Sequence, residues 1–147
     1  MEKFVIHGSR PLKGRLEVRG AKNAAFPLLA ATILTKKDCL IENLPLIEDV
    51  FRMIEILESM GAEVQWKGKR AVSINTKHLD PSAMDTKLVR RFRGSVLLMG
   101  PLLSRFGRVF LPVPGGDIIG ARPIYTHLDA FSQLGAKVSS KGNGFEV

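Results

Sequence analysis

Apolar side chains change their spacing along the chain, and this pattern predicts alternating helices and strands. Residues 23–34 are rich in small and apolar side chains, and apolar residues recur at intervals of three and four across residues 47–57, as on one face of a helix. A short apolar run at residues 39–41 is typical of a buried strand. Two β-like stretches, at residues 64–66 and 71–74, flank a lysine-glycine-lysine turn and predict a hairpin.

The order of these elements occurs twice. When the sequence is displaced by 74 positions, the interval from Gly61 to Gly135, Arg19-Gly20 coincides with Arg93-Gly94 and several apolar positions coincide as well. Gly61 and Gly135 each follow a predicted helix directly, where a C-cap glycine is common. Two repeats result, residues 19–92 and 93–147, of which the second is incomplete.

The second repeat has predicted elements of its own. Residues 88–103 are expected to form one helix with Thr86 as its N-cap, residues 109–111 a strand, and residues 124–134 a second helix. A hairpin begins after this helix, and the chain is expected to end within it. Helices that alternate with strands indicate an α/β protein.

Composition and charge narrow the class of protein. The 147 residues are 45% hydrophobic, enough to bury one core, and their net charge of +8 attracts anions. Basic residues are scattered and form no long run, so nucleic acid is not expected as a partner. The single cysteine, Cys39, excludes an internal disulfide, and the histidines show no metal-ligand spacing. Without an apolar run long enough for a membrane span or a secretion signal, a cytoplasmic protein with no membrane partner is expected.

Two segments contain the residue types of an anion site. Residues 114–123 place glycines, Asp117 and Arg122 in a loop before a helix, where backbone amides, the helix dipole and a guanidinium favour phosphate. The first helix opens in a similar way at Lys22 and Asn23. Both segments also have simpler interpretations: a glycine-rich turn with a solvent-facing acid and arginine, and an N-capping Asn23 beside a solvated Lys22.

Arg93 is a further candidate, because it is the counterpart of Arg19 beside the repeated glycine. Arginines at positions 90, 91 and 93 lie in a predicted helix, where successive side chains point about 100° apart, so they cannot all face one ligand. From the residues alone, an α/β protein is expected, in which these segments form either a basic anion site, used for catalysis or for binding without chemistry, or ordinary solvent-facing turns.

These segments also carry a family resemblance. The chain resembles UDP-N-acetylglucosamine enolpyruvyl transferases (1-carboxyvinyltransferases) over essentially its whole length, in the motifs Gly20-Ala21-Lys22-Asn23-Ala24-Ala25, Arg93-Gly94-Ser95, Gly100-Pro101-Leu102, Arg105-Phe106-Gly107 and the loop at residues 114–123. The resemblance implies an inside-out α/β barrel of βαβαββ repeats, about two of which are present. It implies transfer of the enolpyruvyl group of phosphoenolpyruvate to the 3-hydroxyl of UDP-N-acetylglucosamine with release of phosphate, the first committed step of peptidoglycan synthesis, without a metal or other cofactor.

The resemblance also implies roles for single residues. Lys22 would hold the phosphate of phosphoenolpyruvate with Asn23 beside it, and Arg93 and Arg122 would supply positive charge to the two anionic substrates. Asp117 stands where most relatives have the cysteine that donates a proton, and a carboxylic acid is able to donate in its place. Lys22 and Arg122 would act in catalysis together with Asp117. Contacts with UDP-N-acetylglucosamine are expected at Pro123, Ile124, Tyr125 and Thr126, although relatives commonly have other residues at the last two positions.

Relatives in this family are much longer than the chain. They have two domains of three repeats with the active site between them, and their general base and further arginines lie in the C-terminal part. Residues 1–18 are therefore expected to be a strand region that packs with the missing C-terminal part of the same enzyme, and residues 19–147 a partial transferase domain. We expect the chain to be inactive alone. The alternative is an enzyme like enolpyruvylshikimate-phosphate synthase, although residues 114–123 favour the UDP-sugar.

Overall fold

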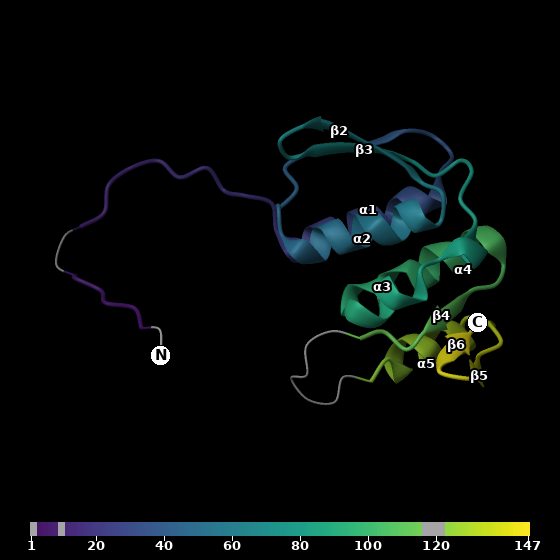
Figure 1. The fold of residues 1–147 in the computed structure, drawn as a ribbon. Coiled ribbons are helices and arrows are strands. Elements are labelled where there is room, and N and C mark those ends of the chain that lie inside the picture. Colours follow the sequence, from purple (N-terminus) through teal and green to yellow (C-terminus); the bar gives the residue numbers. More distant parts are fainter. Residues whose placement is uncertain (1–2, 9–10, 116–122) are drawn as a thin grey trace.

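Two units built from the same elements lie side by side in the computed structural model, which describes residues 3–8, 11–115 and 123–147 (Figure 1). The first unit contains α1 (Lys22–Ala31), η1 (Thr32–Leu34), β1 (Cys39–Ile41), α2 (Glu48–Ser59), β2 (Glu63–Gly68) and β3 (Ala71–Asn75). The segments η2 (Pro81–Ala83) and α3 (Thr86–Arg91) lead to the second unit. That unit contains η3 (Arg93–Leu98), α4 (Met99–Phe106), β4 (Phe110–Pro112), α5 (Tyr125–Gln133), β5 (Ser139–Lys141) and β6 (Gly144–Glu146).

The two sheets share one topology. The strand order is β1-β3-β2 in the first sheet and β4-β6-β5 in the second, and neighbouring strands are antiparallel in both. In each unit one helix, α2 or α5, connects the first strand to an edge strand, and the last strand enters between these two. The repeated sequence therefore folds into a repeated unit, and the predicted α/β class is confirmed.

Glycines end the helices at the positions that the repeat predicts. Gly61 has φ 93° and Gly135 has φ 95°, both in the left-handed region that favours glycine. Their amides donate to the carbonyls of Glu58 and Ser132 at 2.8 and 2.9 Å, respectively. In each unit, the glycine after the helix thus turns the chain from the helix into the following strand.

The single helix predicted for residues 88–103 is wrong. The helix α3 ends at Arg91, Phe92 is extended with φ −139° and ψ 112°, and α4 begins only after the 3-10 turn η3. Thr86 is not the N-cap. The Asp85 carboxylate caps α3 instead, because it accepts hydrogen bonds from the first free amides of the helix at 2.7 and 3.3 Å.

The hairpin at the end of the second repeat is complete, which corrects the expectation that the chain ends within it. The central strand β6 pairs with both β4 and β5. Gly142 closes the turn with φ 58°. Val147 exchanges two backbone hydrogen bonds with Val109, at 2.9 and 2.8 Å, and so extends the ladder to the last residue.

One apolar core runs through both units. Many of its fully buried side chains come from α1, α2 and β3 of the first unit and from η3 and α4 of the second, among them Leu29, Met53, Ile74, Leu98 and Leu102. Figure 1 shows α1 and α2 along one face of the first sheet, with α3 and α4 next to them. Since α1 contacts η3 and η1 contacts α4, the two units bury their helices against each other.

The N-terminal segment leaves the first unit as an extended chain (Figure 1). Its described residues, 3–8 and 11–18, form no helix or strand, and the side chains of Phe4, Ile6 and Leu16 are almost fully exposed. Packing of this segment against a further part of the enzyme stays a prediction. Among the residues that the structure describes, no helix is long and apolar enough to cross a bilayer.

Arg105 joins the two units through polar contacts at the edge of the core. Its guanidinium donates to the Ile33 carbonyl and to the Thr76 hydroxyl, both at 2.8 Å, and to the Lys77 carbonyl at 3.3 Å. The buried Thr76 hydroxyl donates in turn to the Thr35 carbonyl at 2.8 Å. Hydrogen bonds from a charged donor are stronger than neutral ones, so this cluster holds α4 against the end of η1.

Replacing Arg105 with alanine is expected to lower the free energy of unfolding by about 1.5–3 kcal/mol, because buried acceptors lose a charged donor. Arg108→Ala is the matched control, since that side chain is 79% exposed and its one ion-pair partner among the described residues is Glu146. The control is expected to change stability by less than about 1 kcal/mol. Urea unfolding of both variants gives the comparison, and equal losses would contradict a bridging role for Arg105.

Candidate functional site

A polar hollow of about 370 Å³ opens where the first turns of α1 and α2 meet the connection from α3 to η3. Its lining consists of Lys22, Asn23, Phe26, Glu48, Asp49, Arg52, Arg91, Phe92, Arg93 and Gly94. Three predicted site residues, Lys22, Asn23 and Arg93, therefore meet at one place although they come from different repeats. The interpretation of Asn23 as an N-cap is wrong, because α1 begins at Lys22 and its N-cap is Ala21.

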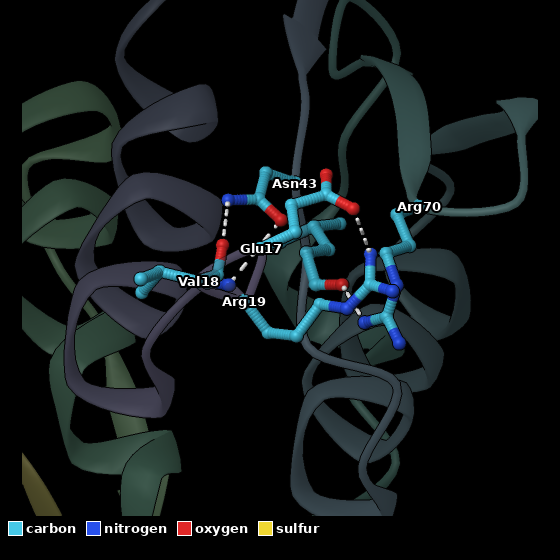
Figure 2. Close-up of polar contacts among 7 residues, drawn as sticks. Glu17, Val18, Arg19, Asn43 and Arg70 are labelled. Atoms are coloured by element: carbon cyan, nitrogen blue, oxygen red, sulfur yellow. Dashed lines mark hydrogen bonds and ion pairs between the residues drawn. The ribbon is translucent and has the colours of Figure 1, made fainter. Parts of the chain in front are cut away.

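The start of α1 is held by a contact that requires glycine. A Cβ on Gly20 would stand 1.9 Å from the Asn43 carbonyl oxygen, so the two backbones could not approach as they do. The Asn43 side chain accepts a hydrogen bond from the Gly20 amide at 3.3 Å and donates to the Val18 carbonyl at 3.5 Å (Figure 2). Asn43 has φ 54°, a left-handed conformation that asparagine tolerates better than most residues. These contacts fix the chain just before Lys22.

Further polar contacts surround the place where Gly20 meets Asn43. The Arg70 guanidinium donates to the Leu44 carbonyl at 3.1 Å (Figure 2). The Arg70 carbonyl in turn accepts from the Leu44 amide at 2.9 Å. The segment after Asn43 is thereby tied to the turn between β2 and β3. Arg19 pairs with Glu17 at 3.2 Å on the surface, whereas its repeat counterpart Arg93 lines the hollow.

The first turn of α2 brings two carboxylates to the hollow. Asp49 accepts a hydrogen bond from Lys22 Nζ at 3.0 Å, and Glu48 forms an i,i+4 ion pair with Arg52. The dipole of α2 favours negative charge at this end of the helix. Arg52 also donates to the Arg91 carbonyl at 3.1 Å, so α2 is joined to the end of α3.

A buried aromatic pair lies beneath these polar groups. The rings of Phe26 and Phe92 have centroids 5.0 Å apart and meet edge to face at 76°. Phe92 breaks the helix, and Arg91 and Arg93 on either side of it both line the hollow, whereas Arg90 is not among the lining residues. Gly94 leaves room for the Phe92 ring, since a Cβ there would stand 2.1 Å from it.

The loop before α5 contacts the segment from α3 to η3 at both of its described ends. Gly115 packs against α3 so closely that a Cβ would stand 1.3 Å from the Arg90 carbonyl oxygen. At the other end, the Pro123 carbonyl accepts a hydrogen bond from the Arg93 guanidinium at 3.3 Å. Both ends of the loop thus contact the segment from α3 to η3.

The other predicted site residues do not line this hollow or lie outside the described residues. Asp117 and Arg122 lie outside the described residues. The side chain of Ile124 is buried in the core, whereas Thr126 is exposed. Tyr125 is 68% exposed and lines a separate hollow formed by residues of α5, β5 and β6. Contacts of these residues with UDP-N-acetylglucosamine stay a prediction.

The positive charges in the hollow are partly neutralised by carboxylates that line the same hollow. Lys22 and Arg52 have carboxylate partners, whereas Arg91 and Arg93 form no ion pair within the part of the chain that the structure describes. The hollow therefore keeps an excess of positive charge, which suits an anionic ligand. Among the described residues, no group of histidine, cysteine, aspartate and glutamate side chains is arranged to hold a metal ion.

Two described carboxyl groups have a shifted pKa, and neither lines the hollow. Burial, with a contribution from the nearby charge of Glu55, raises the pKa of Glu58. Hydrogen bonds from the side chain and amide of Ser82 lower the pKa of Asp80. Each shift has a local structural cause at the surface of the first unit and indicates no catalytic role.

Sequence reasoning missed the charged residues of α2 and the second arginine of the connection, namely Glu48, Asp49, Arg52 and Arg91. Acidic residues in the first turn of a helix are a recognisable signal, but they occur equally on solvated helix starts. Only the packing of α2 against α1 shows that Asp49 reaches Lys22. Arg91 is missed because the helix was predicted to continue through Phe92.

Together, these features define the class of protein: an α/β protein built from two copies of one unit, with a basic hollow at their junction. A profile of the EPSP synthase (3-phosphoshikimate 1-carboxyvinyltransferase) family matches residues 6–147, and the chain belongs to this family. The enolpyruvyl transferase NikO from Streptomyces tendae has a similar structure, with a TM-score of 0.75 over 96% of this chain and 31% of its own. At 24% identity, this similarity supports the fold alone.

Curated relatives are more similar in sequence. A UDP-N-acetylglucosamine 1-carboxyvinyltransferase of Helicobacter pylori is 43% identical over 94% of this chain. The enzyme of the same name from Bradyrhizobium diazoefficiens is 42% identical over 93%, and one from Carboxydothermus hydrogenoformans is 43% identical over 99%. The chain covers 33%, 32% and 34% of these relatives, respectively, so it spans about a third of their length.

Gly20→Ala is expected to lower the free energy of unfolding by about 1–3 kcal/mol, because the added Cβ displaces the chain before Lys22 from Asn43. Gly68→Ala is the control, since nothing lies within 4 Å of a Cβ at that position. Its effect is expected to stay within about 1 kcal/mol, the usual loss or gain for glycine in a strand. Chemical unfolding measures both, and a Gly20→Ala variant as stable as the control would contradict the close packing.

Proposed function

We propose that this chain supplies part of the active site of a UDP-N-acetylglucosamine 1-carboxyvinyltransferase. The enzyme transfers the enolpyruvyl group of phosphoenolpyruvate to the 3-hydroxyl of UDP-N-acetylglucosamine and releases phosphate, at the first committed step of peptidoglycan synthesis. The observation that carries the proposal is the meeting of Lys22 and Asn23 with Arg93 in one basic hollow. Relatives that carry this name at 42–43% identity support the choice of the sugar nucleotide.

In this proposal Lys22 holds the phosphate group of phosphoenolpyruvate. Its ammonium lies at the first residue of α1, where the helix dipole adds to its positive charge. Asn23 offers an amide that donates to substrate oxygens beside it. Arg93, with Arg91, supplies guanidinium groups that suit carboxylate and phosphate oxygens. The hollow thus has room and charge for a small anion between the two repeats.

Asp117 is the proposed proton donor. As the sugar 3-oxygen bonds to C2 of phosphoenolpyruvate, a proton joins the methylene C3, and later loss of phosphate and one methyl proton restores the double bond. Arg122 is assigned to the charge that develops on the substrates. This assignment is supported by the described ends of the loop, since Gly115 and Pro123 both contact the segment that carries Arg93.

The remaining groups of the active site are assigned to the part of the enzyme that this chain does not cover. That part is proposed to supply the general base and to close over the hollow, and the exposed apolar residues 3–18 are proposed to pack with it. Without it, the chain is expected to bind substrate but not to turn it over. Because both substrates are metabolites of the cell interior, we place the enzyme in the cytoplasm.

A shikimate-phosphate enzyme is the second candidate, because the family profile carries that description. Both reactions consume phosphoenolpyruvate, so Lys22 serves either one. They differ in the acceptor, and the loop at residues 114–123 resembles that of the UDP-sugar enzymes. A plain anion-binding module is the third candidate, and it would bind phosphate or phosphoenolpyruvate without releasing a product.

Phosphate release from phosphoenolpyruvate is expected to depend on UDP-N-acetylglucosamine when it is measured with the enzyme that contains this chain. Lys22→Ala is expected to lower kcat/KM about 10²–10³-fold through loss of charge at the phosphate, and Asp117→Ala to lower it about 10²–10⁴-fold through loss of the proton donor. Lys36→Ala, at an exposed lysine after η1, is the control that leaves the rate unchanged.

Other results would separate the alternatives. Release that requires shikimate 3-phosphate in place of the UDP-sugar would support the second candidate. Binding of phosphoenolpyruvate without release under any condition would support the binding module. Release at the wild-type rate by Asp117→Ala would reject Asp117 as the proton donor and leave the assignment of the substrates intact.

A further inference from the structure

The ammonium of Lys22 already has an anionic partner within the chain. The Asp49 carboxylate accepts its hydrogen bond at 3.0 Å, and the two side chains are 50% and 40% exposed. A lysine ammonium has three donors, so one is directed at Asp49 and two are free to meet a ligand. A phosphate group that reaches Lys22 must therefore share the ammonium with this carboxylate or displace it.

The position of Asp49 is fixed by the fold. It lies in the first turn of α2, which packs against α1, and the dipole of α2 stabilises its negative charge there. The Lys22 ammonium also lies 6.0 Å from the centre of the Phe26 ring, within reach of a cation–π interaction. The lysine side chain is thus held by contacts with both a carboxylate and an aromatic ring.

The other carboxylate of the hollow has a different partner. Glu48 pairs with Arg52, and Arg52 also donates to the Arg91 carbonyl. Asp49 is therefore the carboxylate whose charge acts directly on Lys22. Arg91 and Arg93 have no carboxylate partner within the described residues, so Asp49 weakens the attraction of Lys22 for a ligand more than that of these two arginines.

We propose that Asp49 is an internal competitor that limits how tightly Lys22 holds phosphate. The inference deepens the role that the proposed function gives to Lys22. Asp49 partly neutralises the Lys22 ammonium, which weakens the attraction of that ammonium for a bound phosphate, and the carboxylate also repels the phosphate. Inorganic phosphate is therefore held weakly and leaves easily. A substrate that also reaches the arginines is less affected, because more of its binding comes from them. Asp49 is thus a positioning residue that favours substrate over released phosphate.

Binding of inorganic phosphate to the chain, measured by isothermal titration calorimetry, tests this proposal. Asp49→Asn is expected to bind phosphate about two- to fivefold more tightly than the wild type. In this variant the ligand no longer has to break or share a half-exposed ion pair in order to contact Lys22. Its affinity is also expected to fall more steeply with salt. Asp49→Glu keeps the charge and is expected to resemble the wild type. Glu55→Gln removes one charge from an exposed position on the same helix and is the matched control.

A merely structural role for Asp49 predicts the opposite result, because a disturbed hollow binds phosphate less well. Equal or weaker binding by Asp49→Asn, or no binding by either protein, overturns the proposal, and so does an equal gain in Glu55→Gln. Thermal unfolding confirms that each variant is folded. The test is independent of turnover: tighter phosphate binding by Asp49→Asn together with phosphate release that ignores the UDP-sugar would keep this inference and reject the transferase.

Discussion

Neither repeat can bury its helices without the other, and this constraint determines where the candidate site lies. Leu29 and Ile33 of the first repeat are fully buried, and the elements that carry them contact η3 and α4 of the second. Packing of η3 against α1 and of α4 against η1 brings the segment before η3 to the first turn of α1. The hollow is formed by the polar ends of elements whose apolar faces make the shared core.

Gathering positive charge at this junction is unfavourable unless it is compensated. The fold provides compensation from α2, whose first turn supplies Glu48 and Asp49, and from the Arg91 carbonyl, which accepts from Arg52. These partners neutralise the cations on the first-repeat side of the hollow. The charge that remains available belongs to the arginines around Phe92, so the attraction for a ligand is strongest at the boundary between the repeats.

The sequence predicts those parts of the fold whose causes are local. Periodic apolar residues and a glycine C-cap are enough to predict α2, and Gly61 and Gly135 mark both helix ends. The prediction of one long helix across Phe92 is wrong because the break depends on a residue far away in the sequence. The Phe92 ring packs on Phe26, and this contact overrides the helical spacing. Asp49 is missed for the same reason, since its partner lies 27 residues away. The motifs indicate Lys22, Asn23 and Arg93, but not the carboxylate that competes for one of them.

The repeat conserves backbone geometry more closely than chemistry. Gly20 and Gly94 occupy equivalent positions, yet one permits contact with the Asn43 carbonyl and the other makes room for an aromatic ring. At the same displacement of 74 positions, Glu48 corresponds to Arg122, so an acid in one copy is a base in the other. Both copies contribute residues to the same junction, so a difference in charge between them gives each copy a different part in the hollow. The first repeat contributes a lysine moderated by its own carboxylate, and the second contributes Arg93, which has no such partner in the described chain.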